Sequence, residues 1–212
     1  MLALTTLMAP ISWGSTYWVV TEMLPADRPF LVAAMRVLPA GLLLIAIGVA
    51  TSGWRPRGRE WRDTAVLALF NFALFMPLLV AATYRVPGGV VASLGGLQPL
   101  LVAMLTWAIR GERPRGADVV IGALAAGGVV LVVGGIGDGY DPVGVAAALG
   151  ANVSFAIGVV LTKALPTPRD RVAATGWQLL MGALVIVPLA IFMEGIPPHL
   201  DGGDTIGFAY IS

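Results

Sequence analysis

Long apolar stretches alternate with short polar loops along the whole chain. Each stretch is close to the length of about 20 residues that an α-helix needs to cross the hydrocarbon of a bilayer. The stretches cover residues 2–22, 30–50, 64–84, 88–108, 117–136, 143–163 and 172–193, and an eighth begins near Thr205. The pattern predicts an all-α integral membrane protein with about seven transmembrane helices and the start of an eighth.

The first apolar stretch is predicted to be a retained helix. No Lys or Arg precedes it, it is longer than the core of a signal peptide, and no convincing small-residue cleavage site follows it. The chain ends at Ser212, about eight residues into its last apolar stretch, and a helix of that length does not span a bilayer. We therefore expect a fragment or a truncated form.

Composition supports a membrane protein without a soluble domain. Hydrophobic residues make up 58% of the chain and charged residues 12%, whereas about a quarter of the residues of a soluble domain are charged. Cysteine is absent, which excludes disulfides and thiolate catalysis. The single histidine, His199, has no accompanying metal ligands, and no catalytic triad or carboxylate pair falls at membrane depth. The sequence predicts no metal, no cofactor and no enzymatic activity.

Basic residues are distributed unevenly between alternate loops. The loops after the second, fourth and sixth stretches hold ten of the thirteen Lys and Arg residues, while most acidic residues lie in the other loops. Cytoplasmic loops of membrane proteins are enriched in Lys and Arg. The distribution predicts that the N-terminus is cytoplasmic.

The first stretch recurs in altered form in the sixth. The segment Val20-Thr-Glu-Met-Leu-Pro25 aligns with Leu161-Thr-Lys-Ala-Leu-Pro166, about 141 residues later. Since an odd number of spans separates equivalent points, the two copies cross the membrane in opposite directions, and Lys163 replaces Glu22 at the matched helix end. Inverted repeats of this kind are typical of secondary transporters, which bind substrate between the two halves.

Several motifs occur in this order along the predicted spans. They are Ser12-Trp-Gly-Ser-Thr-Tyr17, Arg36, Ala81-Ala-Thr-Tyr84, Ser93-Leu-Gly-Gly-Leu-Gln-Pro-Leu100 and Gly111-Glu-Arg-Pro114. With them, the chain resembles the bacterial EamA-type members of the drug/metabolite transporter superfamily.

The resemblance implies a carrier of ten helices, built from two inverted five-helix repeats, that exports metabolites and often exchanges them for protons. On this basis residues 1–137 form a first repeat with spans one to five. Residues 143–212 form an incomplete second repeat with spans six, seven and the start of an eighth.

Span one carries small, hydroxyl and aromatic residues that suit a substrate cavity. Trp13 and Tyr17 lie one helical turn apart and are predicted to line the cavity, together with Ser15. Trp18 and Thr21 are weaker candidates. Helix packing is an equally good explanation, because small residues and hydroxyls also mediate contacts between membrane helices.

Arg36 is a charge inside the predicted second span. Such a charge is costly unless it snorkels, pairs or faces water, so it is a functional candidate for gating or for orienting an anionic group. The structural alternative is that it snorkels or pairs with Glu22 or Asp27. At an offset of 142 residues its repeat partner is Gln178, which argues against a symmetric clamp of two arginines.

Three neutral polar residues complete the predicted site. Asn71 precedes Pro77 in span three, and Gln98 lies beside Pro99, so we expect kinks that expose polar groups at depth. Asn152 lies in a stripe of small residues with Gly144, Ala148 and Ala156, which favours tight packing at the repeat interface. The predicted cavity residues are Trp13, Ser15, Tyr17, Arg36, Asn71, Gln98 and Asn152.

The sequence therefore favours a secondary transporter that exports small metabolites across the bacterial cytoplasmic membrane by alternating access. Its expected partners are a small-molecule substrate and the lipid bilayer, with no nucleic acid, and the sequence leaves open whether two copies form a homodimer. The competing class is a non-transporting membrane protein, either an intramembrane enzyme or a truncated, inactive subunit.

Overall fold

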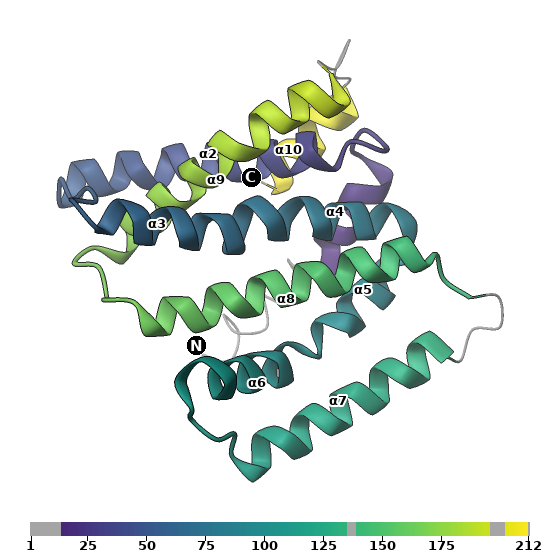
Figure 1. Ribbon diagram of the computed structural model, residues 1–212. Coiled ribbons are helices and arrows are strands. Elements are labelled where there is room, and N and C mark those ends of the chain that lie inside the picture. The colour runs from purple at the N-terminus through teal and green to yellow at the C-terminus, as the bar shows by residue number, and fades with distance from the viewer. Residues whose placement is uncertain (1–13, 135–138, 196–201, 212) are drawn as a thin grey trace, which may run out of the picture.

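The computed structural model describes residues 14–134, 139–195 and 202–211, and the regular structure within these ranges is helical (Figure 1). A helical segment at 14–22 comes first. It is followed by α2 (Pro29–Thr51), α3 (Glu60–Ala68), the π-helical turn η1 (Leu69–Leu74), α4 (Phe75–Arg85), α5 (Gly88–Gly95), α6 (Gln98–Arg110), α7 (Gly116–Gly134), α8 (Pro142–Ala164), α9 (Arg171–Glu194) and α10 (Gly202–Ile211). The predicted all-α fold is confirmed.

Five helical stretches are long and apolar enough to cross a membrane. They are Pro29–Thr51, Glu60–Arg85, Gly88–Arg110, Pro142–Ala164 and Arg171–Glu194, and they match five of the predicted spans. The predicted span at 117–136 corresponds to α7, which contributes the shorter apolar stretch Gly116–Leu131. Most of the predicted first span lies outside the described residues.

The ends of the long helices follow from local sequence. Pro142 lies in the first turn of α8, where its missing N–H costs nothing, and the Asp141 carboxylate accepts the Val143 N–H at 2.9 Å. Asp170 caps α9 in the same way by accepting the Ala173 N–H at 3.0 Å. Gly111 ends α6 with φ +71°, a left-handed conformation that favours glycine.

The third span is irregular in the turn that precedes its proline. Pro77 lies inside the continuous helical stretch Glu60–Arg85, where it cannot donate an N–H to the preceding turn, and that turn is the π-helical η1 (Leu69–Leu74). The irregular backbone expected near Pro77 is therefore present as a π-turn, and Asn71 lies inside it.

The fourth span is broken into two helices. α5 ends at Gly95, the residues Gly96 and Leu97 form a turn, and α6 begins at Gln98 with Pro99 in its first turn. The predicted break beside Gln98 and Pro99 is confirmed.

Helices α2 and α9 pack antiparallel with their backbones close together. A Cβ added at Gly48 would lie 2.5 Å from Ala173 Cβ, and one added at Gly176 would lie 2.8 Å from the Ile45 backbone nitrogen. At one end of the pair the Glu194 carboxylate accepts the N–H groups of Phe30 and Leu31 at 2.7 and 2.8 Å. Small residues allow this approach, as in other membrane helix pairs.

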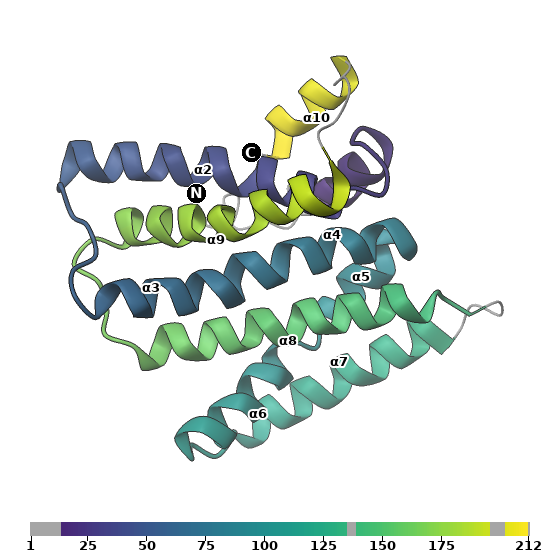
Figure 2. The ribbon, with the colours of Figure 1, turned by 45° about the horizontal axis from the view of Figure 1, so that its top comes forward.

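The remaining helices form layers beside this pair. In both views the rod made of α3, η1 and α4 lies between α2–α9 and α8, and α6 and α7 lie at the far edge (Figures 1 and 2). The predicted stripe on α8, with Gly144, Ala148, Asn152 and Ala156, is buried. A Cβ at Gly144 would lie 2.6 Å from Arg85 Cβ, so the stripe packs tightly, as predicted.

The basic loops gather at one end of the bundle. The loops 52–59, 111–115 and 165–170 lie at that end, which we call the Arg-rich end (Figure 1). The opposite end carries Glu194 and the salt bridge between Arg85 and Asp141, whose Nη1 and Oδ2 atoms are 2.8 Å apart.

Candidate functional site

Gln98 and Asn152 form a polar pair at the break between α5 and α6. Gln98 Nε2 donates to the Asn152 backbone carbonyl at 3.0 Å and to Asn152 Oδ1 at 2.9 Å. Asn152 Nδ2 donates in turn to the Ala148 carbonyl at 2.8 Å, and Asn152 is only 4% exposed. Two residues that were predicted separately are thus joined across 54 positions of sequence.

The amide oxygen of Gln98 is an acceptor that this pair leaves without a donor. Gln98 Oε1 is buried, and no described residue donates a hydrogen bond to it. A buried acceptor left without a donor costs about 1–3 kcal/mol, so native structures rarely retain one without a reason. This acceptor lies at the helix break between α5 and α6.

Asn71 lies against the same helix, α8, but further toward the Arg-rich end. Its Oδ1 occupies the space that a Cβ at Gly158 would need. Ser154 Oγ donates to the Phe70 carbonyl at 2.8 Å, so α8 also contacts the backbone of η1. Gly158 is six residues after Asn152, which is about 9 Å of helix rise. The structure therefore places Asn71 beside the pair without joining it to the pair.

Tyr17 and Arg36 lie in two different elements, the segment 14–22 and α2. Arg36 is half-buried in α2. Tyr17 also packs on the apolar cluster that contains Val91, Leu94 and Ala148, so it lies near the α8 helix that carries Asn152.

Arg36 does not pair with Glu22 or Asp27 among the residues that the structure describes. The salt bridges found in those residues are Arg85–Asp141 and Arg110–Glu112. The structural alternative of an ion pair that fixes helix packing is therefore not observed, and the functional interpretation of Arg36 stays a prediction.

A pocket of about 380 Å³ lies between the segment 14–22 and α5. It is lined by Gly14, Tyr17, Trp18, Thr21, Gly88, Gly89 and Ala92. Trp18 and Thr21, the weaker candidates of the sequence, both line it. Gly88 was missed: a Cβ there would lie 2.8 Å from Tyr17 Cβ, and the signal for this approach was the pair of glycines directly after Pro87.

Ser15 makes a contact outside this pocket. Ser15 Oγ is 2.7 Å from Tyr210 Oη of α10, and this hydrogen bond ties the segment 14–22 to the last described helix. Trp13 lies outside the described residues. The structure thus brings Gln98 together with Asn152, and it leaves Ser15 and Asn71 in contacts of their own.

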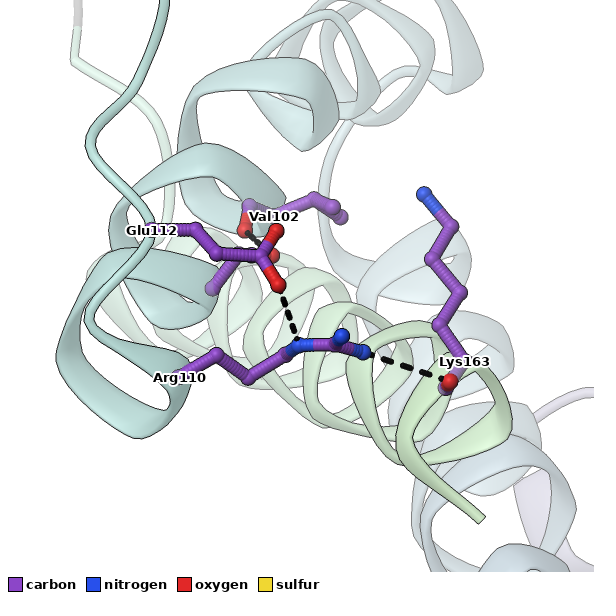
Figure 3. A network of polar contacts seen from close by, with 5 residues as sticks. Val102, Arg110, Glu112 and Lys163 are labelled. Carbon is purple, nitrogen blue, oxygen red and sulfur yellow. Dashed lines mark hydrogen bonds and ion pairs between the residues drawn. The ribbon is translucent and has the colours of Figure 1, made fainter. Parts of the chain in front are cut away.

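Arg110 links α6 to the end of α8 at the Arg-rich end. Its Nε donates to Glu112 Oε1 at 2.8 Å and its Nη1 donates to the Lys163 carbonyl at 3.3 Å (Figure 3). The Lys163 ammonium group points away from Arg110 in this view. From the sequence alone Arg110 counts only toward the orientation of the chain in the membrane, because its partner carbonyl at Lys163 is distant in sequence.

Two carboxylates outside the spans have lowered pKa values. The Arg85 guanidinium, helped by the Val143 N–H, holds the pKa of Asp141 below its usual range. The Ser52 hydroxyl and the Ala173 N–H lower the pKa of Asp170. Both groups join elements that are far apart in sequence.

The comparisons with known proteins agree with this architecture. Residues 1–134 match the model of the EamA-like transporter family. The chain is 39% identical over 207 residues to protein PecM of Dickeya dadantii, covering 96% of this chain and 68% of that protein. It is 31% identical to a chloroplastic WAT1-related protein of Arabidopsis thaliana, covering 98% of this chain and 53% of that protein.

A more distant relative and a solved structure also match the chain. The uncharacterized transporter YvbV of Bacillus subtilis is 28% identical, and the alignment covers 87% of this chain and 61% of that protein. The fold also matches a crystal structure with a TM-score of 0.62 at 24% identity, over 97% of this chain and 72% of the other. The chain is a multi-pass membrane protein that belongs to the EamA-like transporter family.

Proposed function

We propose that this protein is a secondary transporter that exports small metabolites across the bacterial cytoplasmic membrane by alternating access. The observation that carries the proposal is the Gln98–Asn152 pair at the break between α5 and α6. Transporters build their substrate sites at broken helices near the middle of the membrane. Gln98 Oε1 supplies a buried acceptor at such a break.

The polar and aromatic groups define the chemistry of the proposed substrate. Gln98 Oε1 requires a hydrogen-bond donor, such as an amine, amide or hydroxyl group. Tyr17 and Trp18 line the pocket beside α5 and offer flat apolar surface, which suits an amphiphilic molecule. Arg36, a half-buried charge in α2, would orient an anionic group.

The loop charges support a cytoplasmic N-terminus. The three loops of the Arg-rich end would face the cytoplasm, and the end with Glu194 and Asp141 would face outward. In this orientation the segment 14–22 runs outward from the cytoplasm, as the sequence predicts.

The α2–α9 pair supports two inverted repeats, with residues 1–137 in the first and residues 143–212 in the second. Shifting residues 29–51 of α2 by 142 gives 171–193, which α9 (Arg171–Glu194) matches closely. The same shift relates Ser52 to Glu194. Ser52 follows α2 and donates to Asp170 at the start of α9. Glu194 ends α9 and accepts from Phe30 at the start of α2.

Proton exchange is the coupling mode that the family resemblance implies. Among the described residues, acidic side chains of the membrane-spanning stretches lie at helix ends, as Asp118 and Glu194 do. A proton path in this protein would therefore use groups near the membrane surfaces. Export measured with and without an imposed pH gradient tests this coupling.

Metabolite profiling of the medium tests export. Cells that express the chain should release at least one small polar metabolite faster than cells with an empty vector. Gln98→Leu should reduce the release about tenfold or more, because loss of a buried hydrogen bond costs about 1–3 kcal/mol. Thr106→Val is the matched control, since the Thr106 hydroxyl donates to the Val102 carbonyl within its own helix. Equal metabolite profiles with and without the chain would contradict export and favour the non-transporting class.

A further inference from the structure

A second pocket lies at the Arg-rich end, away from the proposed transport site. It has a volume of about 570 Å³ and is lined by Ser52, Gly53, Trp54, Arg55, Arg57, Arg59, Glu60, Arg169 and Asp170. These residues come from the loop between α2 and α3 and from the loop between α8 and α9, which lie at the same end of the bundle in both views (Figures 1 and 2). Four of the lining residues are arginines.

The two carboxylates of this pocket are already engaged by other donors. Glu60 Oε2 accepts the Arg57 backbone N–H at 2.8 Å. Asp170 accepts the Ser52 hydroxyl and the Ala173 N–H. Within the described ranges, the salt bridges involve Arg85 and Arg110, which lie outside this pocket. The four guanidinium groups therefore keep their donors for another acceptor, and the pocket carries an excess of positive charge.

The loop that carries three of these arginines has a defined conformation. Pro56 is fully buried, and Gly53 and Gly58 adopt φ values of +60° and +51°, which favour glycine. Ser52 Oγ connects the loop to Asp170 and accepts the Trp54 N–H at 3.2 Å. The arginines thus extend from a turn of defined conformation. A loop that served only to orient the chain in the membrane would need the charges but not this conformation.

Guanidinium groups match the oxygen geometry of phosphate. Each presents paired N–H donors that bind two phosphate oxygens at once, and several around one pocket balance the charge of a phosphate. Trp54 lies in the same wall, and tryptophan is common at the membrane–water interface. We propose that this pocket binds a phosphate group, carried either by the headgroup of an anionic phospholipid or by a soluble phosphate.

Binding to the purified full chain tests the proposal and separates the two sources. The chain is placed in nanodiscs of phosphatidylcholine with or without phosphatidylglycerol, and native mass spectrometry counts the phosphatidylglycerol that stays bound. Inorganic phosphate is titrated calorimetrically into the phosphatidylcholine nanodiscs. Retention of phosphatidylglycerol supports the lipid source, and phosphate binding supports the soluble source. Absence of both from the wild-type chain overturns the proposal.

The decisive comparison uses two pairs of arginines at the same end. Arg57→Gln with Arg59→Gln removes two pocket arginines, and Arg113→Gln with Arg115→Gln removes two exposed arginines outside the pocket. The pocket variant should bind about tenfold more weakly or worse, and the control should change by less than about threefold. Equal losses in both variants would show general surface attraction and overturn the proposal.

A third variant keeps the charge. Arg57→Lys with Arg59→Lys preserves the positive loop and hence the membrane orientation, but it removes the paired donors. We expect binding to weaken about threefold or more relative to the wild-type chain. Undiminished binding by this variant would overturn the assignment to the arginine donors, even if the glutamine variant inserts incorrectly.

Discussion

Asn152 shows how one buried polar side chain joins two helices. It donates to the Ala148 carbonyl and accepts from Gln98, so loss of its amide leaves a Gln98 donor without a partner. We expect Asn152→Ala to destabilise the fold, and the double variant with Gln98→Ala to cost less than the sum of the single variants. The coupling should be about 1 kcal/mol, in the range of hydrogen bonds between membrane helices. Unfolding in mixed micelles measures it, and strict additivity would contradict the observed contact.

Gly158 leaves no room for a side chain. Its missing Cβ is the space that Asn71 Oδ1 fills, whereas a Cβ at Gly150 would meet Leu78 Cδ1 at an ordinary 3.5 Å. We expect Gly158→Ala to destabilise the fold by about 1–3 kcal/mol and Gly150→Ala to have little effect. Adding Asn71→Ala should recover part of the loss at Gly158. An equal effect of the two glycine variants would contradict the packing of Asn71 against α8.

Asp141 makes the stability of the fold depend on pH under acidic conditions. Because the pKa of Asp141 in the folded protein is lowered by Arg85, its ionised form stabilises the fold above the unfolded pKa of about 4. This contribution disappears as the pH falls through the folded-state pKa. Asp141→Asn should lower the Tm at pH 7, and the difference from wild type should shrink progressively as the pH falls below about 4. A Tm difference that does not shrink as the medium is acidified would contradict the ionic origin.

At the scale of elements, α2 and α9 behave as one unit because each end of the pair is fixed. Glu194 serves as a distant cap for the first turn of α2, which has no side-chain cap of its own. We expect Glu194→Ala to destabilise the protein by about 1–2 kcal/mol, since it removes an acceptor and a charge that favours a helix N-terminus. Glu194→Gln should retain part of this stabilisation. Thermal unfolding in detergent compares the variants, and an unchanged Tm for Glu194→Ala would contradict the capping role.

Helix bounds were predicted well from the sequence where the length of an apolar stretch or the position of a proline determines them. The spans corresponding to α2, α8 and α9 were correct within a few residues, and Pro99 marked the break of the fourth span. Pro77 indicated an irregular turn before it but not the π-helical form of that turn, which also contacts α8 through Phe70 and Asn71. Such a choice of backbone depends on a helix that is distant in sequence.

Partners within the candidate site were harder to predict than its members. Gln98 and Asn152 were identified from a helix break and a packing stripe, but nothing local indicated that they bond to one another. Ser15 was expected in the cavity and instead contacts Tyr210, because the chemistry of a hydroxyl does not distinguish a ligand from a neighbouring helix. The sequence shows which residues can form hydrogen bonds, whereas their partners depend on how distant helices pack.

At the scale of the whole molecule, the distribution of charge between the two ends predicts how it lies in the membrane. The chain has no cysteine, so a single introduced cysteine is the only thiol that a maleimide can label in it. Ala26→Cys lies at an exposed position near α2, and Thr167→Cys lies at an exposed position of the Arg-rich end. An impermeant maleimide should label Ala26→Cys in intact cells and Thr167→Cys only after permeabilisation. The reverse pattern would contradict the proposed cytoplasmic N-terminus.

The π-turn η1 lies inside the third span, between α3 and α4. A π-turn contains one residue more than the α-helix would need, so deleting a residue from 69–74 would restore a regular helix of nearly the same length. The wider π-turn already takes up the extra residue, so the side chains after such a deletion would keep their direction around the axis, whereas a deletion from regular helix would rotate them by about 100°. Tyr84, which donates to the Pro25 carbonyl at 2.8 Å, would therefore keep facing its acceptor after a deletion within 69–74 and would turn away from it after a deletion within 75–83. The π-turn thus makes the third span tolerant of a one-residue deletion at that position, and the α-helix after it remains sensitive to the same change.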